Sequence, residues 1–373
     1  MNEALKNIYT VNLGVKKDER ALVFTDLVRE DEEVDAAERE KREDLRKIAH
    51  EVAEAGSGLC EVSFFEFPAV ETHGKEPPRE LWEAAFGAEA VKRLDGDGLL
   101  EKILDKSIYD VDDNRSAERL IDEFAKTPDV VVALSNFSTS HTRFRNYLTR
   151  LKKVRYASMP LFERFMLDGA MTADWHAVEA RTKRLVGMMT GGQTVVVTSH
   201  NGTSISFSIS RREVLPDTGI LTEPGSFGNL PAGEAFVAPV EGTAEGTLIL
   251  EWSPAGKLRE SITLEVTKGK VVKVIGADRY ADTLRAKLAE IPLIGNIAEL
   301  GIGTNDKATR PDNILETEKI LGTVHIAIGD NASFGGRVSV PFHQDFIFFR
   351  PTLEVIKGGE ERTAVILEGE PQF

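Results

Sequence analysis

The sequence predicts an α/β fold in two parts, an N-terminal α/β domain with a mostly parallel sheet and a C-terminal, β-rich α+β domain. Three observations predict this fold. The 373 residues suffice for two domains of roughly 150 residues or more. In the first half, short apolar runs alternate with helical stretches, as in crossover units around a parallel sheet. After Gly191 and Gly192 short alternating runs dominate, so we place the domains at residues 1–190 and 191–373.

The N-terminal elements follow from apolar periodicity. From Asp35 to Ala55 apolar residues recur at helical spacing, and Gly56 and Gly58 then mark the end of the helix. The run DVVVAL at residues 129–134 is typical of a buried strand. The predicted strands are residues 21–25, 59–65, 129–134 and 154–158, and the predicted helices are residues 35–55, 80–94, 115–126 and 173–188.

The C-terminal elements are mostly short strands. The runs TVVVTS, TSISFSIS, EAFVAPV, GTLILEW, SITLEV and KVVKVI alternate in polarity and are separated by turn residues, which predicts antiparallel or mixed sheets. One helix is predicted at Tyr280–Glu290, and Gly301-Ile-Gly303 is predicted to form a turn.

The charge balance argues against one class of partner. The chain has 46 Lys and Arg against 61 Asp and Glu, a net charge of −15, whereas a duplex nucleic-acid binder needs a basic surface. The single cysteine, Cys60, rules out an internal disulfide and a cysteine-rich metal site. The N-terminus is polar and no run of about 18 apolar residues occurs, so we expect a cytoplasmic protein without membrane contact.

Two of the seven histidines lie among carboxylates in the C-terminal domain. His343 and Asp345 in PFHQDFIFF are two residues apart, so on a strand both project from the same face. His325 in GTVHIAIGD, Glu234 in PAGEAFVAPV and Glu299 in GNIAELGIG also interrupt apolar runs. Burying a carboxylate among such neighbours is costly unless a cation compensates its charge. The C-terminal domain is therefore expected to bind metal.

These five residues exceed the ligands of one tetrahedral zinc site. If they converge, shared carboxylates could hold two divalent ions about 3.5–4 Å apart, one to polarise a substrate carbonyl and one to activate water. Each residue taken singly has another interpretation, because a histidine beside a carboxylate is commonly a satisfied polar pair and a glutamate at a strand end can be exposed. The combination favours the metal site.

For a general base we consider Glu316 and Glu318 in ILETEKILGTVH, the nearest other carboxylates before His325. A base within one water of the metal could take the proton of the nucleophile. The alternative is a solvated charged segment in which Lys319 pairs with either glutamate.

Several motifs resemble a known family. The segments LPAGEAFVAP, NIAELGIG, GTVHIAIG and His-x-Asp occur in the order of the metal-site motifs of the thermophilic metallo-aminopeptidases, that is aminopeptidases T and S and leucyl aminopeptidase-like proteins. RYASMP at residues 155–160 and GAMTAD at residues 169–174 resemble the archaeal-type branch of that family.

The resemblance implies a homodimer with a dinuclear zinc, cobalt or manganese site that releases N-terminal amino acids from peptide substrates. The family's ligands fall on the five residues named above. One departure concerns a tyrosine that the better-known members carry shortly after the third motif. This sequence has none there, and Asp330 or Asn331 would have to substitute.

Two alternatives remain open. The same scaffold resembles a ring-opening 2,5-dihydroxypyridine dioxygenase, in which histidines and a carboxylate hold one ferrous ion. His325, His343 and Asp345 could form such a triad, although Glu234 and Glu299 would then be surplus. The second alternative is a non-catalytic binding protein that a metal stabilises, and the missing tyrosine favours it.

Overall fold

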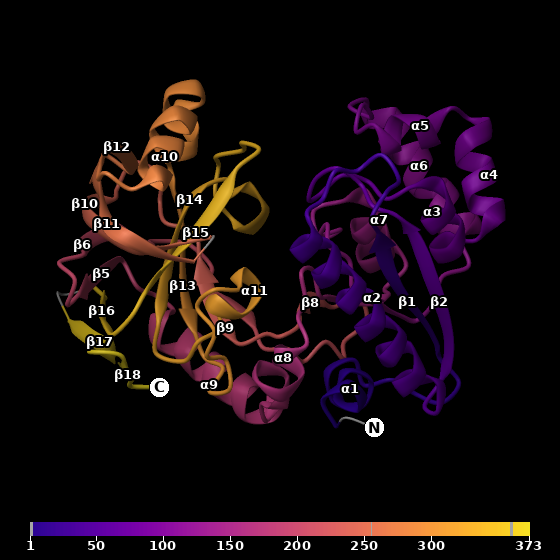
Figure 1. Ribbon diagram of the computed structural model, residues 1–373, viewed down its shortest axis with the longest axis horizontal. Coiled ribbons are helices and arrows are strands. Elements are labelled where there is room, and N and C mark those ends of the chain that lie inside the picture. Colours follow the sequence, from indigo (N-terminus) through magenta and orange to yellow (C-terminus); the bar gives the residue numbers. More distant parts are fainter. Residues whose placement is uncertain (1–2, 255, 359–360) are drawn as a thin grey trace. The chain divides into compact units, whose positions relative to one another are not determined.

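The computed structural model describes residues 3–254, 256–358 and 361–373, and the chain divides into two compact units (Figure 1). Unit 1 comprises Met1–Thr172 and Gly219–Pro231, and unit 2 comprises Ala173–Thr218 and Ala232–Phe373. The boundary expected at residue 190 falls inside unit 2, just after its long helix.

Unit 1 is built on a parallel sheet with strand order β2-β1-β3-β4-β8. Each neighbouring pair in it runs parallel. The predicted α/β domain with a mostly parallel sheet is therefore confirmed. The strands are β1 (Arg20–Leu27), β2 (Glu61–Pro68), β3 (Val130–Ala133), β4 (Arg155–Ser158) and β8 (Phe227–Asn229).

The helices predicted at residues 35–55 and 115–126 are present as α2 and α6, whereas several shorter helical segments of unit 1 were not predicted. The single helix expected over residues 80–94 is wrong, because Gly87 adopts a φ of 84° and separates two helices. The helical segments are α1 (Glu3–Asn7), η1 (Ile8–Asn12), α2 (Ala36–Ser57), α3 (Arg79–Phe86), α4 (Ala88–Gly96), α5 (Leu99–Leu104), α6 (Val111–Phe124), α7 (Arg143–Asn146), η2 (Tyr147–Leu151), α8 (Phe165–Asp168) and η3 (Ala170–Thr172).

Unit 2 contains two sheets and is rich in antiparallel strands, which confirms the predicted β-rich α+β part. The larger sheet has the order β12-β11-β10-β6-β5-β16-β17-β18, and the smaller has the order β15-β14-β13-β9-β7. The larger sheet consists of β5 (Thr194–Ser199), β6 (Ser204–Ser208), β10 (Glu245–Ser253), β11 (Gly256–Thr267), β12 (Lys270–Ile275), β16 (Pro351–Ile356), β17 (Arg362–Leu367) and β18 (Glu370–Pro371).

The smaller sheet carries the predicted ligands. It consists of β7 (Leu215–Asp217), β9 (Glu234–Val237), β13 (Ile297–Gly303), β14 (Val324–Gly329) and β15 (His343–Phe348). The remaining elements of unit 2 are α9 (Trp175–Met189), α10 (Arg279–Glu290), η4 (Pro292–Gly295), α11 (Ile314–Thr317) and η5 (Ala332–Phe334).

One face of the smaller sheet belongs to the core of unit 2. Val237, Leu300 and Ile326 are buried in one cluster with Val195 and Leu248 of the larger sheet. Because successive side chains on a strand alternate between faces, the residues between these apolar positions lie on the opposite face. That face is available for polar chemistry.

Among the described residues, no helix combines the length and the apolar character that crossing a bilayer requires.

A buried carboxylate in unit 1 gives a test of the fold. Glu76 accepts hydrogen bonds from the backbone N–H groups of Arg143, at 2.6 Å, and Phe144, at 3.1 Å. Burial raises the pKa of Glu76, and these two bonds oppose the shift. Glu76→Ala leaves both donors without this acceptor, so we expect a loss of about 2–4 kcal/mol in the free energy of unfolding. Urea denaturation measures it. The exposed Glu123 serves as control, since Glu123→Ala should change stability by less than about 0.5 kcal/mol. Equal stabilities for the two variants would contradict this role of Glu76.

Candidate metal centre

Four neighbouring strands bring the five predicted ligands together. Glu234 begins β9, Glu299 lies in β13, His325 lies in β14, and β15 contributes His343 and Asp345. The strand register pairs Gly303 with Glu234, Gly301 with His325, Ala327 with Asp345 and Gly329 with His343. All five ligand candidates therefore lie on the sheet face opposite the apolar core.

Two glycines on this face allow close approaches, one by a ligand side chain and one by the backbone. A Cβ atom on Gly301 would lie 1.9 Å from Nε2 of His325, and one on Gly303 would lie 2.0 Å from the carbonyl oxygen of Ile320. Both glycines belong to β13, so the turn predicted at Gly301–Gly303 is wrong. Glycine in a strand can mark a close approach of other groups, and in the sequence such a glycine looks the same as one in a turn.

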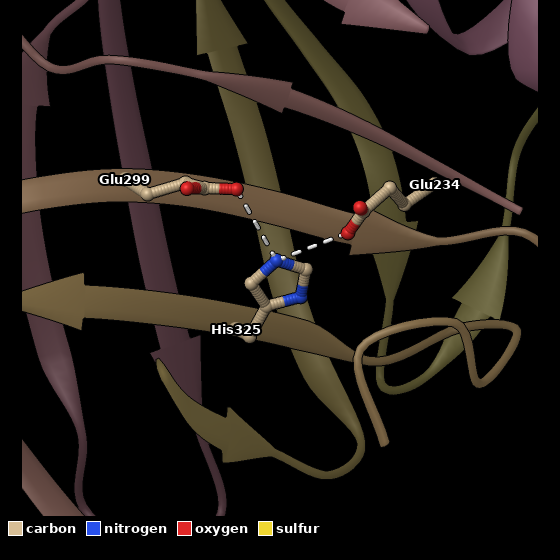
Figure 2. Close-up of side chains that lie close together, drawn as sticks. All are labelled: Glu234, Glu299 and His325. Carbon is tan, nitrogen blue, oxygen red and sulfur yellow. Dashed lines mark ion pairs between the residues drawn. The ribbon is translucent and has the colours of Figure 1, made fainter. Parts of the chain in front are cut away.

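The donor atoms form two groups that share one carboxylate. In the first, Nε2 of His325 lies 3.2 Å from Oε2 of Glu234 and 3.6 Å from Oε1 of Glu299 (Figure 2). In the second, Nε2 of His343 lies 3.3 Å from Oε2 of Glu299 and 3.4 Å from Oδ2 of Asp345. Within each group the donor atoms all lie within 4.8 Å of one another.

The spacing and the chemistry of these donors fit a metal ion. Two ligands at about 2.1 Å from one ion and at right angles or somewhat wider lie roughly 3.0–3.4 Å apart, close to the distances found here. Oδ1 of Asp345 is buried without a hydrogen-bond partner. Buried carboxylate oxygens without partners are costly in a protein, and a cation compensates for that cost. Imidazole and carboxylate together suit iron, zinc and manganese.

A hydrogen bond to a residue outside the centre orients the imidazole ring of His343. Its Nδ1 lies 2.8 Å from the backbone carbonyl oxygen of Asp330, so Nδ1 carries the proton and donates it to that oxygen. This arrangement leaves the lone pair of Nε2 facing Glu299 and Asp345, as a metal ligand requires.

Asp330 or Asn331 was expected to substitute for the missing tyrosine, but both side chains form hydrogen bonds within the adjoining loop. Oδ2 of Asp330 accepts from the N–H of Val340 at 3.1 Å, and Oδ1 of Asn331 accepts from the N–H of Val338 at 2.9 Å. Nδ2 of Asn331 donates to Glu241. These contacts give both residues a structural role.

The charged groups of the centre shift one another's pKa values. Burial opposes the charge on His325, but hydrogen bonding to Glu234 and Glu299 outweighs it and raises the pKa of His325 well above its usual value. Burial likewise opposes the charge on His343, and Asp345 and Glu299 raise the pKa of His343. The same attraction overcomes burial and lowers the pKa of Asp345. The centre is thus built to hold ionised carboxylates next to positive charge.

Lys319 is a permanent cation at the edge of the first group. Its side chain is 0% exposed, and Nζ donates to Oε1 of Glu234 at 2.6 Å and to Oε2 of Glu318 at 3.0 Å. Burial opposes its charge, yet Glu234 and Glu318 raise its pKa well above the usual value. The sequence suggested that Lys319 could pair with Glu316 or Glu318, and gave no sign that it reaches Glu234.

The two glutamates considered as general bases have different surroundings. Oε1 of Glu316 accepts from the N–H groups of Thr309, at 2.6 Å, and Arg310, at 3.1 Å, so this residue holds the loop before α11. Glu318 lines the pocket at the centre, and burial raises its pKa to about 8 although Lys319 opposes the shift. Only Glu318 is placed where a base could meet a substrate.

A pocket with both apolar and polar walls adjoins the centre. His325 and Asp345 form part of its wall, so a molecule in the pocket would lie beside the candidate ligands. The remaining lining residues are Trp252, Ser253, Pro254, Pro311, Asp312, Thr317, Glu318, Gln344, Phe346 and Ile347. The indole, proline and isoleucine side chains suit a flat ring, and the polar groups suit its substituents.

A protein-family model decides the family. The model described as 2,5-dihydroxypyridine 5,6-dioxygenase matches residues 114–357, which include the whole candidate centre. The chain belongs to this family. A curated 2,5-dihydroxypyridine 5,6-dioxygenase of Pseudomonas putida KT2440 is 28% identical over 165 residues, which cover 40% of this chain and 47% of that protein. The matched stretch therefore spans about half the length of the relative.

Two solved structures share the fold over almost the whole chain. The 2,5-dihydroxypyridine dioxygenase of Pseudomonas putida KT2440 has a TM-score of 0.68 at 19% identity, with 99% of this chain and 96% of that chain covered. Wild-type AmpT of Thermus thermophilus has a TM-score of 0.55 at 15% identity, with 100% and 98% covered. The resemblance to aminopeptidase T therefore holds for the scaffold.

The family match corrects three expectations from the sequence. The family match is to dioxygenases and not to metallo-aminopeptidases. The expected enzyme class, a peptide hydrolase, is therefore wrong. The expected pair of zinc, cobalt or manganese ions is wrong as well. All three rested on the resemblance of the motifs to those of the aminopeptidases, which share the scaffold. A dioxygenase with a single ferrous ion was one of the two alternatives to the aminopeptidase in the sequence analysis. The expected homodimer stays a prediction.

Gly301 gives a test of how the sheet face is built. Gly301→Ala places a methyl group where the imidazole of His325 lies, so the ring must move away from Glu299 and Glu234. We expect a loss of about 10–100-fold in affinity for Mn²⁺, since groups that position ligands have effects of this size. Equilibrium dialysis with Mn²⁺ measures it. Gly187→Ala, at an open position in α9, should leave the affinity unchanged. A folded Gly301→Ala variant with wild-type affinity would contradict the packing argument.

Proposed function

We propose that this protein is an iron-dependent dioxygenase that opens a dihydroxylated pyridine-type ring. The observation that carries the proposal is the match to the dioxygenase family over residues 114–357, which include every residue of the candidate centre. A centre of imidazole and carboxylate groups beside a pocket with flat apolar walls supports it. When bound, a ferrous ion supplies the one-electron chemistry that allows O₂ to react with an aromatic ring.

The ferrous ion would be held by Glu299, His343 and Asp345. Asp345 also lines the pocket, and the side chain of His343 is 32% exposed, so this group is the more accessible of the two. It replaces one histidine of the usual two-histidine, one-carboxylate triad with a glutamate. The triad expected from the sequence, with His325 in place of Glu299, is not among the groups of donors that converge in the described part of the chain.

The pocket residues would bind and orient the ring. Trp252, Pro311 and Ile347 offer apolar surfaces for the faces and edges of a planar ring. Glu318 faces the same pocket and would take the proton from a ring hydroxyl group onto its carboxylate. Lys319 holds the Glu318 carboxylate in place through a 3.0 Å hydrogen bond.

Oxygen uptake tests the proposed reaction. Protein reconstituted anaerobically with Fe²⁺ should consume O₂ when 2,5-dihydroxypyridine is added, and the absorbance of the ring should fall in parallel. Asp345→Asn removes one proposed ligand charge, so we expect the rate to fall by about 100-fold or more. Asp282→Asn, at an exposed position in α10, is the matched control and should keep the wild-type rate. Hydrolysis of aminoacyl chromogenic substrates without any oxygen uptake would contradict the proposal.

The pair Glu316 and Glu318 tests the proposed base. Glu318→Gln keeps the shape of the side chain but cannot accept a proton in the same way, so kcat/KM should fall by about 10²–10⁴-fold with unchanged iron content. Glu316→Gln weakens the loop before α11, so it should lower the melting temperature while the folded protein keeps kcat/KM within a few-fold. The reverse pattern, with the larger loss of kcat/KM in Glu316→Gln, would exclude Glu318 as the base.

A further inference from the structure

We propose that the buried ammonium group of Lys319 takes the place of a second metal ion, so that the centre accepts one divalent ion and not two. The ion would lie at Glu299, His343 and Asp345, and the group of Glu234 and His325 would stay without one. This inference rests on the proposed single-iron function and names the residue that sets the metal count.

Ligand number alone does not limit the centre to one ion. The two donor groups each offer three ligand atoms, and Glu299 contributes one oxygen to each group. A carboxylate shared in this way is the arrangement that two-metal sites use. Another feature of the centre must therefore disfavour the second ion.

We assign this effect to Lys319, because its ammonium group contacts Glu234, which belongs to only one of the two donor groups. Its Nζ occupies Oε1 of Glu234, so Glu234 has only Oε2 left for a metal. The backbone fixes Lys319 on both sides: its N–H donates to the carbonyl of Glu316 at 3.0 Å, and its carbonyl accepts from the N–H of Asn305 at 2.9 Å. The ammonium group itself is buried and contacts Glu234 and Glu318, so its charge opposes a second cation that approaches Glu234.

The charge balance points to the same limit. Glu234, Glu299 and Asp345 carry three negative charges, Glu318 adds a fourth when it is ionised, and Lys319 removes one. One divalent ion then leaves these groups neutral or with a single negative charge, which a proton on His325, between Glu234 and Glu299, balances. Two ions would leave an excess of positive charge in a buried site, which is costly. Without Lys319, two ions could be balanced.

The experiment counts metal ions. Metal-free protein is titrated with Mn²⁺, the bound equivalents are measured by equilibrium dialysis with elemental analysis, and magnetic coupling between two bound ions is read by electron paramagnetic resonance. Wild-type protein should bind one equivalent with an uncoupled spectrum. Lys319→Met removes the charge at similar length, so affinity for a second ion should rise by roughly 100-fold or more, with a coupled spectrum.

The controls separate charge removal at this site from a general effect. Lys273→Met removes a largely exposed lysine from β12 in the same unit and should leave the count at one. Lys319→Gln, which is also neutral, provides a second variant if Lys319→Met does not fold by circular dichroism.

Two results would overturn the inference: wild-type protein that binds two ions with similar affinity, or folded neutral variants at Lys319 that still bind one. The titration uses neither O₂ nor a ring substrate, so its failure is distinct from failure of the proposed function. A protein that counts ions as expected but consumes no O₂ would overturn the function alone.

Discussion

The structure of unit 2 depends on the burial of three carboxylates on one face of a sheet. Glu234, Glu299 and Asp345 lie on β9, β13 and β15, whose other face is part of the apolar core. Their charges need compensation inside the protein, because water reaches them poorly. Two imidazoles, one buried ammonium and, in our account, one metal ion supply it. The same compensation that lets the sheet fold therefore creates the reactive site.

This arrangement explains the composition of the polar sheet face. Each ligand candidate has a glycine or an alanine as its strand partner on one neighbouring strand. Gly301 shows the reason most directly, since the ring of His325 fills the space that a Cβ atom would need. All five ligand candidates belong to strands, so the hydrogen-bonded sheet holds their backbone in place. Such rigidity suits a site whose donors must stay within a few tenths of an ångström.

The sequence predicted much of the ligand set, because an acidic residue that interrupts an apolar strand is easy to recognise. The positions of Glu299 and His325 could be predicted in this way. Apolar runs and helical periodicity likewise predicted the parallel sheet of unit 1 and its longer helices, α2 and α6. The role of Gly301 could not, since a glycine in a strand and a glycine in a turn look alike in sequence. The break at Gly87 was missed because apolar periodicity continues across it.

The pattern of ligand residues could not distinguish a two-ion hydrolase from a one-iron dioxygenase on the same scaffold. The five ligand types are compatible with two hydrolytic ions or with one redox-active ion, and the count depends on total charge in three dimensions. Lys319 contributes to that total through Glu234, which lies 85 residues away in the chain and is adjacent only in the folded protein. Sequence reasoning that pairs Lys319 with its nearest glutamates cannot find this contact.

The most direct test of the central claim is elemental analysis of protein purified without added metal under anaerobic conditions. We expect close to one equivalent of iron per chain, with little zinc, cobalt or manganese. Two equivalents of zinc per chain would contradict it, because the centre would then hold the ions of a hydrolase and the charge of Lys319 would not limit their number.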